Sequence, residues 1–422
     1  MKRALIVFAL MVALLLAALL ALALRGNAEQ AVPPSTLNAQ NLPEKQLRGA
    51  YLARAGNCLG CHSTQGGRAY AGGRELPTPF GTFITPNITP DRDTGIGDWS
   101  ADDFWRAMHE GKGREGRLLY PAFPYTEYTK VTRADADAIY AYLQTLPPAK
   151  NAVAANRLDF PYNMRSLLYI WRGLYFKPGV YEPAESESAE WNRGAYLVQG
   201  LGHCNACHVT RNALGAAGGA ALGGGQVAGR SWYAPALNSR SEAGSGALSV
   251  DEIARLLSTS LYNQGAAAGP MAEVIAQSLQ HLTPEDLRSM ALYLKSLPEY
   301  GASGAPPLSK EARLRIDKGG KIYEQHCKDC HGEQGQGAPG AYPPLADNRS
   351  VRLASPLNAI RSVLDGGFAP STVNNPRPYG MPPFAHTLNN EEVAQVVSYI
   401  RNAWGNHASV VTAVQVDKSG SD

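Results

Sequence analysis

Charged residues and cysteines are scarce in this sequence. Charged side chains make up 18% of its 422 residues, whereas a globular protein usually has about 25%. The 39 basic and 36 acidic residues leave a net charge of only +3, which is too balanced to suggest a nucleic-acid partner or a polybasic membrane patch. Six cysteines are far too few for a small scaffold held together by disulfides, so they need another explanation.

Glycine and proline are abundant instead. The chain contains 43 glycines and 29 prolines, and this composition predicts many loops. Hydrophobic residues make up 44% of the chain, so the chain as a whole is not disordered. At about 150 residues per domain, the length predicts two or three domains.

The N-terminus has the pattern of a membrane anchor or a signal segment. Met1-Lys2-Arg3 precedes residues 4–24, which carry no charged or strongly polar side chain, and Arg25 follows. A signal peptide has an apolar region of about 7–15 residues, whereas a spanning helix needs about 20, so the length favours an uncleaved anchor. Ala21-Leu22-Ala23 could still be recognised by a signal peptidase. Both alternatives place the rest of the chain on the outer side of the membrane, with residues 27–42 as a polar tether.

All six cysteines occur in three Cys-x-x-Cys-His motifs. One helical turn spaces two thiols so that each can add to a vinyl group of a haem, and the adjacent histidine then lies under the iron as its proximal ligand. A zinc site or a thioredoxin-like pair would not explain three pairs that are each followed by histidine. We therefore expect three covalently bound haem c groups. The attaching cysteines would be Cys58, Cys61, Cys204, Cys207, Cys327 and Cys330, and the proximal ligands would be His62, His208 and His331.

The sequence around these motifs repeats. Arg48-Gly49-Ala50-Tyr51 precedes the first motif, Arg193-Gly194-Ala195-Tyr196 the second, and Lys318-Gly319-Gly320 the third. Each unit closes with an apolar-periodic helix that begins at a threonine. These closing helices are expected over residues 132–146, 283–297 and 387–404. The expected organisation is an anchor or signal segment (1–26), three units (44–148, 187–299 and 309–406), a linker segment (149–186) and a disordered tail (407–422).

Methionine is the candidate for the second axial ligand, because it raises the potential of a haem. Met381 in the third unit and Met271 in the second both lie shortly before the closing helix. The first unit has Phe123 at the corresponding place, and phenylalanine cannot ligate iron. Either this haem takes Met108 or His109 from the helix upstream, or its iron is five-coordinate or binds water. Other histidines leave a bis-histidine site as a further alternative.

Six separated segments resemble one family when they are taken in order. The segments are "RGAYLARAGNCLGCHS", "GTFITPNITPDRDTGIGDWS", "LYPAFPYTEYTKVT", "RGAYLVQGLGHCNACH", "GPMAEVI" and "GMPPFAHTLNNEEVAQVVSYIRNAWGN". Over about residues 44–406 the chain resembles the triheme cytochrome c subunit of bacterial membrane-bound alcohol, gluconate and aldehyde dehydrogenases. The resemblance implies a mainly α-helical fold of three tandem class I cytochrome c domains with covalent haems, behind an N-terminal transmembrane or signal helix.

The same resemblance implies which residues ligate the iron ions. The three motif histidines would be the proximal ligands, and Met271 and Met381 would be distal ligands. Phe123 departs from the family, which commonly has methionine there. The resemblance therefore does not identify a distal ligand for the first haem.

The resemblance also implies an electron-transfer function. The chain would act on the periplasmic side of the bacterial inner membrane, anchored by residues 4–24. A catalytic subunit with a quinone, flavin or molybdenum cofactor would oxidise an alcohol, aldehyde, sugar acid or similar substrate. The cytochrome would pass the electrons to ubiquinone or a terminal oxidase, and it is not expected to oxidise an organic substrate itself.

Other interpretations stay open at this point. A haem peroxidase or sulfur-compound oxidase could use an open first haem as its catalytic site. A multihaem electron reservoir could dock several soluble carriers. Residues 160–176 are apolar, aromatic and basic, and this segment could lie on the membrane surface, contact the catalytic subunit, approach quinone or pack between domains.

Overall fold

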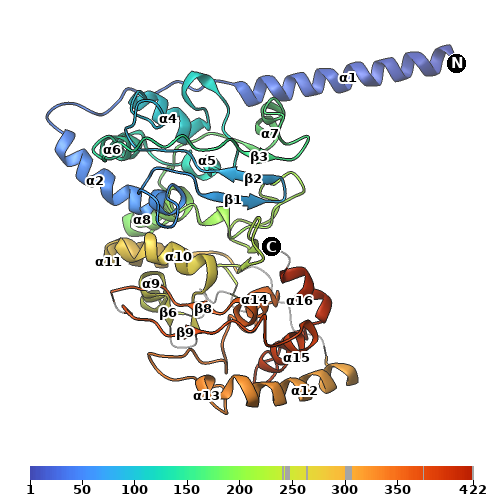
Figure 1. The fold of residues 1–422 in the computed structure, drawn as a ribbon. Coiled ribbons are helices and arrows are strands. Elements are labelled where there is room, and N and C mark those ends of the chain that lie inside the picture. Colours follow the sequence, from blue (N-terminus) through green and yellow to red (C-terminus); the bar gives the residue numbers. More distant parts are fainter. Residues whose placement is uncertain (240–241, 243–247, 263–264, 300–306, 374, 421–422) are drawn as a thin grey trace. The chain divides into compact units, whose positions relative to one another are not determined.

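The computed structural model of the chain describes residues 1–239, 242, 248–262, 265–299, 307–373 and 375–420. The described residues are mainly helical, as predicted, and their strands are short (Figure 1). They form two compact units. Unit 1 comprises Met1–Ala53, Cys61–Glu182 and Gln199–His203, and unit 2 comprises Arg54–Gly60, Pro183–Val198 and Cys204–Asp422. Compactness therefore groups the second and third repeats together, and the three-domain organisation stays a prediction.

The first half of the chain holds the larger sheet, a three-stranded antiparallel one of order β1-β2-β3. The elements of this half are α1 (Lys2–Asn27), α2 (Leu42–Ala55), α3 (Cys58–Cys61), β1 (Glu75–Thr78), β2 (Gly81–Ile84), α4 (Ala101–Glu110), the 3-10 turn η1 (Arg114–Gly116), α5 (Tyr125–Tyr128), α6 (Arg133–Leu143), β3 (Arg157–Leu158), α7 (Leu167–Tyr175), α8 (Ala189–Tyr196) and the π turn η2 (Leu197–Leu201).

The second half contains two-stranded antiparallel ladders between its helices. Its elements are η3 (Cys204–Ala206), β4 (Gly225–Gln226), β5 (Tyr233–Ala234), α9 (Val250–Thr259), β6 (Leu261–Tyr262), β7 (Gly265–Ala266), α10 (Gly269–Gln277), η4 (Leu279–His281), α11 (Pro284–Ser296), α12 (Lys310–His326), α13 (Lys328–His331), α14 (Leu357–Asp365), β8 (Gly367–Phe368), β9 (Gly380–Met381), α15 (Asn390–Ile400) and α16 (Ala413–Gly420).

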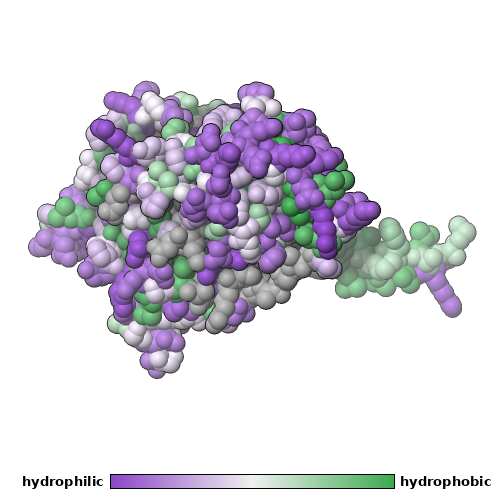
Figure 2. Space-filling view, turned by 90° about the horizontal axis from the view of Figure 1, so that it is seen from below, coloured by the Kyte–Doolittle hydropathy of each residue, from purple (hydrophilic) through white to green (hydrophobic). Residues whose placement is uncertain are grey.

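The N-terminal helix α1 is long and apolar enough to cross a membrane, and it is the one such helix in the described part of the chain. None of its most apolar segment is buried. Figure 2 shows the hydrophobic surface of its projecting part uncovered by other side chains. This geometry fits a membrane anchor and fits a signal helix equally well.

Three pairs of helices cross in the same way. In each pair, a glycine of the helix before a Cys-x-x-Cys-His motif lies against the backbone of the closing helix. A Cβ atom at that glycine would overlap a carbonyl oxygen, which explains why the sequence repeats glycine there. The pairs are α2 with α6 (Gly49 on Ala138), α8 with α11 (Gly194 on Ser289) and α12 with α15 (Gly319 on Gln395).

The first two closing helices begin where the sequence predicts. The side chains of Thr132 and Thr283 accept hydrogen bonds from backbone N–H groups in the first turns of α6 and α11. An aspartate in each first turn pairs with the arginine that precedes the crossing glycine. These ion pairs join Arg48 to Asp135 at 2.6 Å and Arg193 to Asp286 at 2.7 Å.

The predicted start of the third closing helix at Thr387 is wrong. Helix α15 begins at Asn390, and Asn389 is its N-cap. Asn389 and Glu392 form a capping box, in which each side chain accepts a hydrogen bond from the other residue's backbone N–H. This reciprocal pair satisfies two helix-end donors, which a threonine upstream could not do.

The prediction of a disordered tail over residues 407–422 is also wrong up to residue 420, and residues 421–422 lie outside the described part of the chain. Residues 413–420 form helix α16, and Val411 and Val416 are completely buried in the hydrophobic core that α14 and α15 share. The Arg361 side chain also donates a hydrogen bond to the Ser419 carbonyl oxygen at 2.7 Å. These contacts fix a terminus that would otherwise fray.

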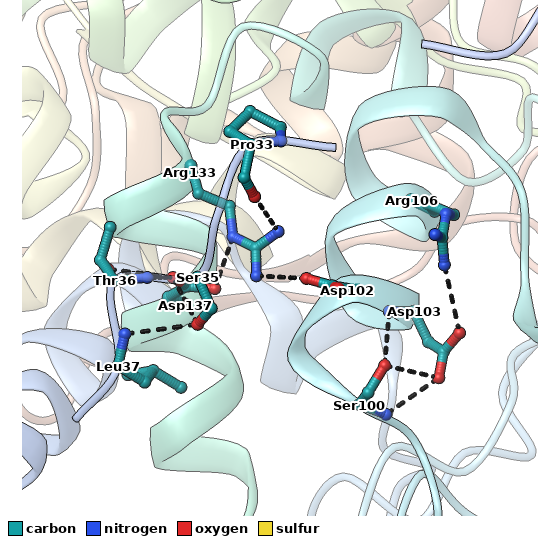
Figure 3. A network of polar contacts seen from close by, with 10 residues as sticks. All are labelled: Pro33, Ser35, Thr36, Leu37, Ser100, Asp102, Asp103, Arg106, Arg133 and Asp137. Atoms are coloured by element: carbon teal, nitrogen blue, oxygen red, sulfur yellow. Dashed lines mark hydrogen bonds and ion pairs between the residues drawn. The ribbon is translucent and has the colours of Figure 1, made fainter. Parts of the chain in front are cut away.

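The predicted tether is fixed to unit 1 by a buried ion pair (Figure 3). Asp137 is fully buried, and its carboxylate accepts hydrogen bonds from the Thr36 N–H at 2.6 Å and the Ser35 hydroxyl at 3.1 Å. Arg133 pairs with Asp137 at 2.8 Å and donates to the Pro33 carbonyl oxygen at 2.9 Å. Residues 33–36 are therefore part of the fold of unit 1.

Candidate functional site

Each Cys-x-x-Cys-His motif forms a single helical turn, as predicted. The turns are α3, η3 and α13. In the second and third motifs the backbone N–H of the histidine donates to the backbone carbonyl oxygen of the first cysteine, at 3.0 Å in both. The turn places both thiols of a motif along one short segment next to the histidine, which is the geometry that two thioether bonds to one haem require.

The three motif histidines make the same hydrogen bond. In each, ring atom Nδ1 lies within hydrogen-bond distance of a proline carbonyl oxygen, which can only accept, so Nδ1 carries the proton. The lone pair on Nε2 is then available to a metal ion. The bonds join His62 to Pro86 at 2.8 Å, His208 to Pro235 at 2.7 Å and His331 to Pro343 at 3.2 Å.

Burial keeps these rings neutral. It lowers the pKa of His62, His208 and His331 below the ordinary value, although the hydrogen bond to the proline carbonyl opposes the shift. Neutral imidazole is the form that binds a metal. The side chains therefore fit the role of proximal haem ligands in donor type, tautomer and charge.

The thiols do not resemble those of a redox pair. Burial raises the pKa of Cys204 to about 12 and that of Cys327 to about 11, whereas a reactive cysteine has a lowered pKa. Among the described residues, no cluster of three or more His, Cys, Asp and Glu side chains is arranged to hold a metal ion directly. The zinc and thioredoxin alternatives thus have no support in this part of the chain.

Met381 and Met271 occupy different local structures. Met381 lies in the β8–β9 ladder and packs, partly buried, against the core of α14, α15 and α16. Met271 lies in the first turn of α10, half-buried, and the glycine at the start of that helix contacts the Trp232 ring. Met290, by contrast, is buried within α11. Met381 and Met271 stay predictions as iron ligands.

Met108 lies at a position that serves packing in the other repeats. Helices α4, α9 and α14 all end at a residue with positive φ, namely Gly111 (62°), Ser260 (68°) and Gly366 (63°). Three residues before these ends lie Met108, Leu257 and Val363, and all three are buried. Leucine and valine cannot ligate iron, so this position has a packing role in two of the three repeats.

His109 is held within unit 1 by other contacts. Its Nδ1 donates to the Thr129 carbonyl oxygen at 2.8 Å, and its ring stacks on Trp105 with centroids 4.4 Å apart. Burial lowers its pKa. The equivalent residues in α9 and α14 are Ser258 and Leu364. The prediction of His109 as a ligand stays untested, and the repeats favour a structural role.

Trp105 was not singled out by the sequence. Its side chain is 1% exposed, and its indole N–H has no hydrogen-bond partner among the described residues. A buried donor without an acceptor costs about 1–3 kcal/mol, and a haem carboxylate would supply an acceptor. The sequence signal was weak: an aromatic residue four positions before a histidine on one helix face.

Phe123, at the place where the second and third repeats have methionine, is half-buried. Its ring packs against Tyr128 with centroids 5.3 Å apart. A hydrocarbon side chain therefore takes this position in the first repeat.

The chain is similar to several known proteins. The family model "Cytochrome c" matches residues 46–147 and 316–404. The cytochrome c subunit of alcohol dehydrogenase (quinone) from Gluconobacter oxydans is 36% identical over 92% of this chain and 85% of its own length. The gluconate 2-dehydrogenase cytochrome c subunit from Pantoea cypripedii is 38% identical over 87% of this chain and 88% of its own. A subunit of nicotinate dehydrogenase from Pseudomonas putida is 42% identical over 88% of this chain, which spans only 32% of that protein.

Proposed function

Because the chain belongs to the family of cytochrome c subunits of dehydrogenases, we propose that it transfers electrons from a catalytic dehydrogenase subunit. What carries the proposal is the common arrangement of His62, His208 and His331, each neutral and each turned by a proline carbonyl so that Nε2 can bind iron. Relatives named for alcohol, gluconate, fructose and nicotinate dehydrogenases support the kind of partner.

The chain would hold three haem c groups, one on each motif. Each bound haem supplies a one-electron change at its iron. The protein's own contribution is to orient the histidines, to exclude water around them, and to supply distal ligands that tune the potential. Met271 and Met381 are the proposed distal ligands in the second and third repeats.

The first haem would have no methionine ligand. Phe123 replaces methionine at the equivalent place, and Met108 lies at a position that leucine and valine occupy in the other repeats. Its iron would be five-coordinate or bind water. This haem would have a lower potential than the other two, because methionine ligation raises the potential.

An oxidase or peroxidase acting at the first haem is a second candidate function. The observation that favours it is the same replacement by Phe123, which leaves a coordination position for a small ligand. This function requires turnover of hydrogen peroxide or a sulfur compound by the purified chain without any partner.

The proposed location is the periplasmic side of the bacterial inner membrane. Helix α1 would be the anchor, with Lys2 and Arg3 on the inner side and the haem-bearing residues outside. Ubiquinone or a terminal oxidase would accept the electrons. Mass spectrometry of the mature protein tests the anchor, since an uncleaved chain retains residues 4–24.

Membranes of the source organism, with and without the chain's gene, provide the functional test. One of the four substrates named by the relatives, or a close analogue, should reduce haem c in the intact membranes under anaerobic conditions. The deletion should abolish respiration on that substrate, and the purified chain alone should not be reduced by it. Respiration that survives the deletion would contradict the proposal.

A further inference from the structure

Helix α7 packs directly against the C-terminal end of α1, as Figure 1 shows. Two glycines allow their backbones to touch. A Cβ atom on Gly173 would overlap the carbonyl oxygen of Leu22, and one on Gly26 would overlap the carbonyl oxygen of Tyr169. The contact therefore has a single register, with one turn of α7 beside Leu22 and the preceding turn beside Gly26.

Buried cations fix this contact. Arg172 of α7 donates to the Gly26 carbonyl oxygen at 2.8 Å and also to the Glu110 carbonyl oxygen. Lys112 donates to the Asn27 carbonyl oxygen at 3.2 Å and pairs with the Glu110 carboxylate at 3.3 Å. Positive charges at a helix C-terminus satisfy its unpaired carbonyl groups and oppose its dipole. The end of α1 is thus fixed to unit 1 and is not a flexible hinge.

The register sets the depth of α7 relative to a membrane. As a helix, residues 4–24 rise about 32 Å, which matches the ~30 Å thickness of the hydrocarbon core of a bilayer. Leu22 then lies at the outer edge of that core, and Gly26 lies among the headgroups. Because α7 contacts both residues, it must lie at the outer boundary of the same bilayer.

The face of α7 turned away from unit 1 is apolar. Leu168, Arg172 and Gly173 are buried, whereas large hydrophobic side chains on and just before the helix are exposed. These exposed side chains are Phe160, Met164, Leu167, Leu174 and Tyr175. An apolar face with aromatic residues is typical of a helix that lies in a membrane interface.

We propose that this face, formed by Phe160, Met164, Leu167, Leu174 and Tyr175, inserts into the outer leaflet of the lipid bilayer as a second membrane contact beside α1. The proposal rests on α1 being the membrane anchor. The rigid contact of α1 with α7 and the depth of Leu22 favour lipid over a protein partner. Two membrane contacts would hold unit 1 in one orientation at the surface, whereas a single flexible anchor would let it rotate.

Spin labels on single added cysteines test the proposal in the full haem-loaded chain, reconstituted in liposomes of phosphatidylcholine and phosphatidylglycerol. Phe160→Cys and Leu174→Cys report on the proposed face, where the native side chains are 78% and 49% exposed. Leu14→Cys reports on the anchor, and Leu314→Cys, on an exposed site of α12 in unit 2, is the aqueous control. The unmodified chain, treated with the same label, gives the background from its own cysteines.

The readout is the ratio of collisions with dissolved oxygen to collisions with a water-soluble nickel chelate. Labels at residues 160 and 174 should show ratios several-fold above that at residue 314 and closer to that at residue 14. Ratios equal to that at 314 would overturn the proposal, and labels that neither reagent reaches would also overturn it, because a second copy would then cover the face. A water-like ratio at residue 14 would instead mean that the anchor itself is wrong.

Discussion

His62 in the first repeat and His331 in the third are held alike, each by a proline carbonyl oxygen, at 2.8 Å and 3.2 Å. The two repeats differ where a second ligand would lie. The third has Met381 in a short ladder against its core, and the first has Phe123 packed on Tyr128. The hydrogen bond that orients the proposed proximal ligand is thus repeated, whereas the residue at the place of the proposed distal ligand differs.

The largest effect should come from removing the cysteines of one motif. Replacing both Cys327 and Cys330 with serine should lower the haem c content from three per chain to two, because no thiol then remains to bond the vinyl groups. The same double change at Cys58 and Cys61 should have the same effect. Haem c content per chain, measured on the denatured protein, checks both variants. An unchanged content in either variant would mean that its motif holds no haem.

The next largest effect is expected from replacing Met381, a change that would make the third repeat resemble the first. Met381→Leu should turn one haem from low to high spin and lower its potential by on the order of 0.1 V or more, since axial ligands set haem potentials over about 0.8 V. Optical redox titration and electron paramagnetic resonance measure both changes. Met290→Leu, in the core of α11, is the matched control and should alter neither. If Met381→Leu leaves all haems unchanged, Met381 is not a ligand.

The sequence predicts the local features of the first two repeats well, whereas its predicted start for the third closing helix, Thr387, is wrong. The motif turns and the caps at Thr132 and Thr283 depend on residues close together in the chain. The partners of the motif histidines could not be predicted, because Pro86 and Pro343 lie 24 and 12 residues downstream in loops of different length.

Other features depended on contacts that no local pattern reveals. The sequence predicts a disordered tail because the segment is terminal. Val416 fills a core built from distant segments, and this burial stabilises α16. Likewise, the tether is fixed by Asp137, a residue about a hundred positions away whose carboxylate would be expected to face solvent.

A smaller effect is expected in the stability of the first repeat. Arg133→Ala should lower the free energy of unfolding by about 3–5 kcal/mol, because it leaves the buried Asp137 carboxylate without its cation. In the third repeat, buried Arg401 is held by backbone carbonyl groups instead. Arg401→Met also removes the desolvation cost of a buried guanidinium that has no carboxylate partner among the described residues, so the net loss should be smaller, about 1–3 kcal/mol. Urea denaturation of the haem-loaded variants measures both changes. Equal losses of unfolding free energy in the two variants would contradict this contrast between the repeats.

The smallest effect is expected from changing Met108 and His109, the ligand candidates of the first haem. Met108→Leu and His109→Gln should leave its spin state and potential unchanged, because the equivalent residues of the other repeats have no ligand role. Electron paramagnetic resonance of the oxidised protein checks this expectation. A change from low to high spin in either variant would identify that residue as the sixth ligand and restore the likeness of the repeats.

Reductive titration of the purified chain under anaerobic conditions tests the central claim most directly. Three haems with one proximal histidine each should take up three electrons per chain. Two should be taken up at higher potential by the methionine-ligated haems, and one at lower potential by a haem that also binds carbon monoxide. Uptake of fewer than three electrons would contradict the account. Three haems of equal potential that all fail to bind carbon monoxide would also contradict it.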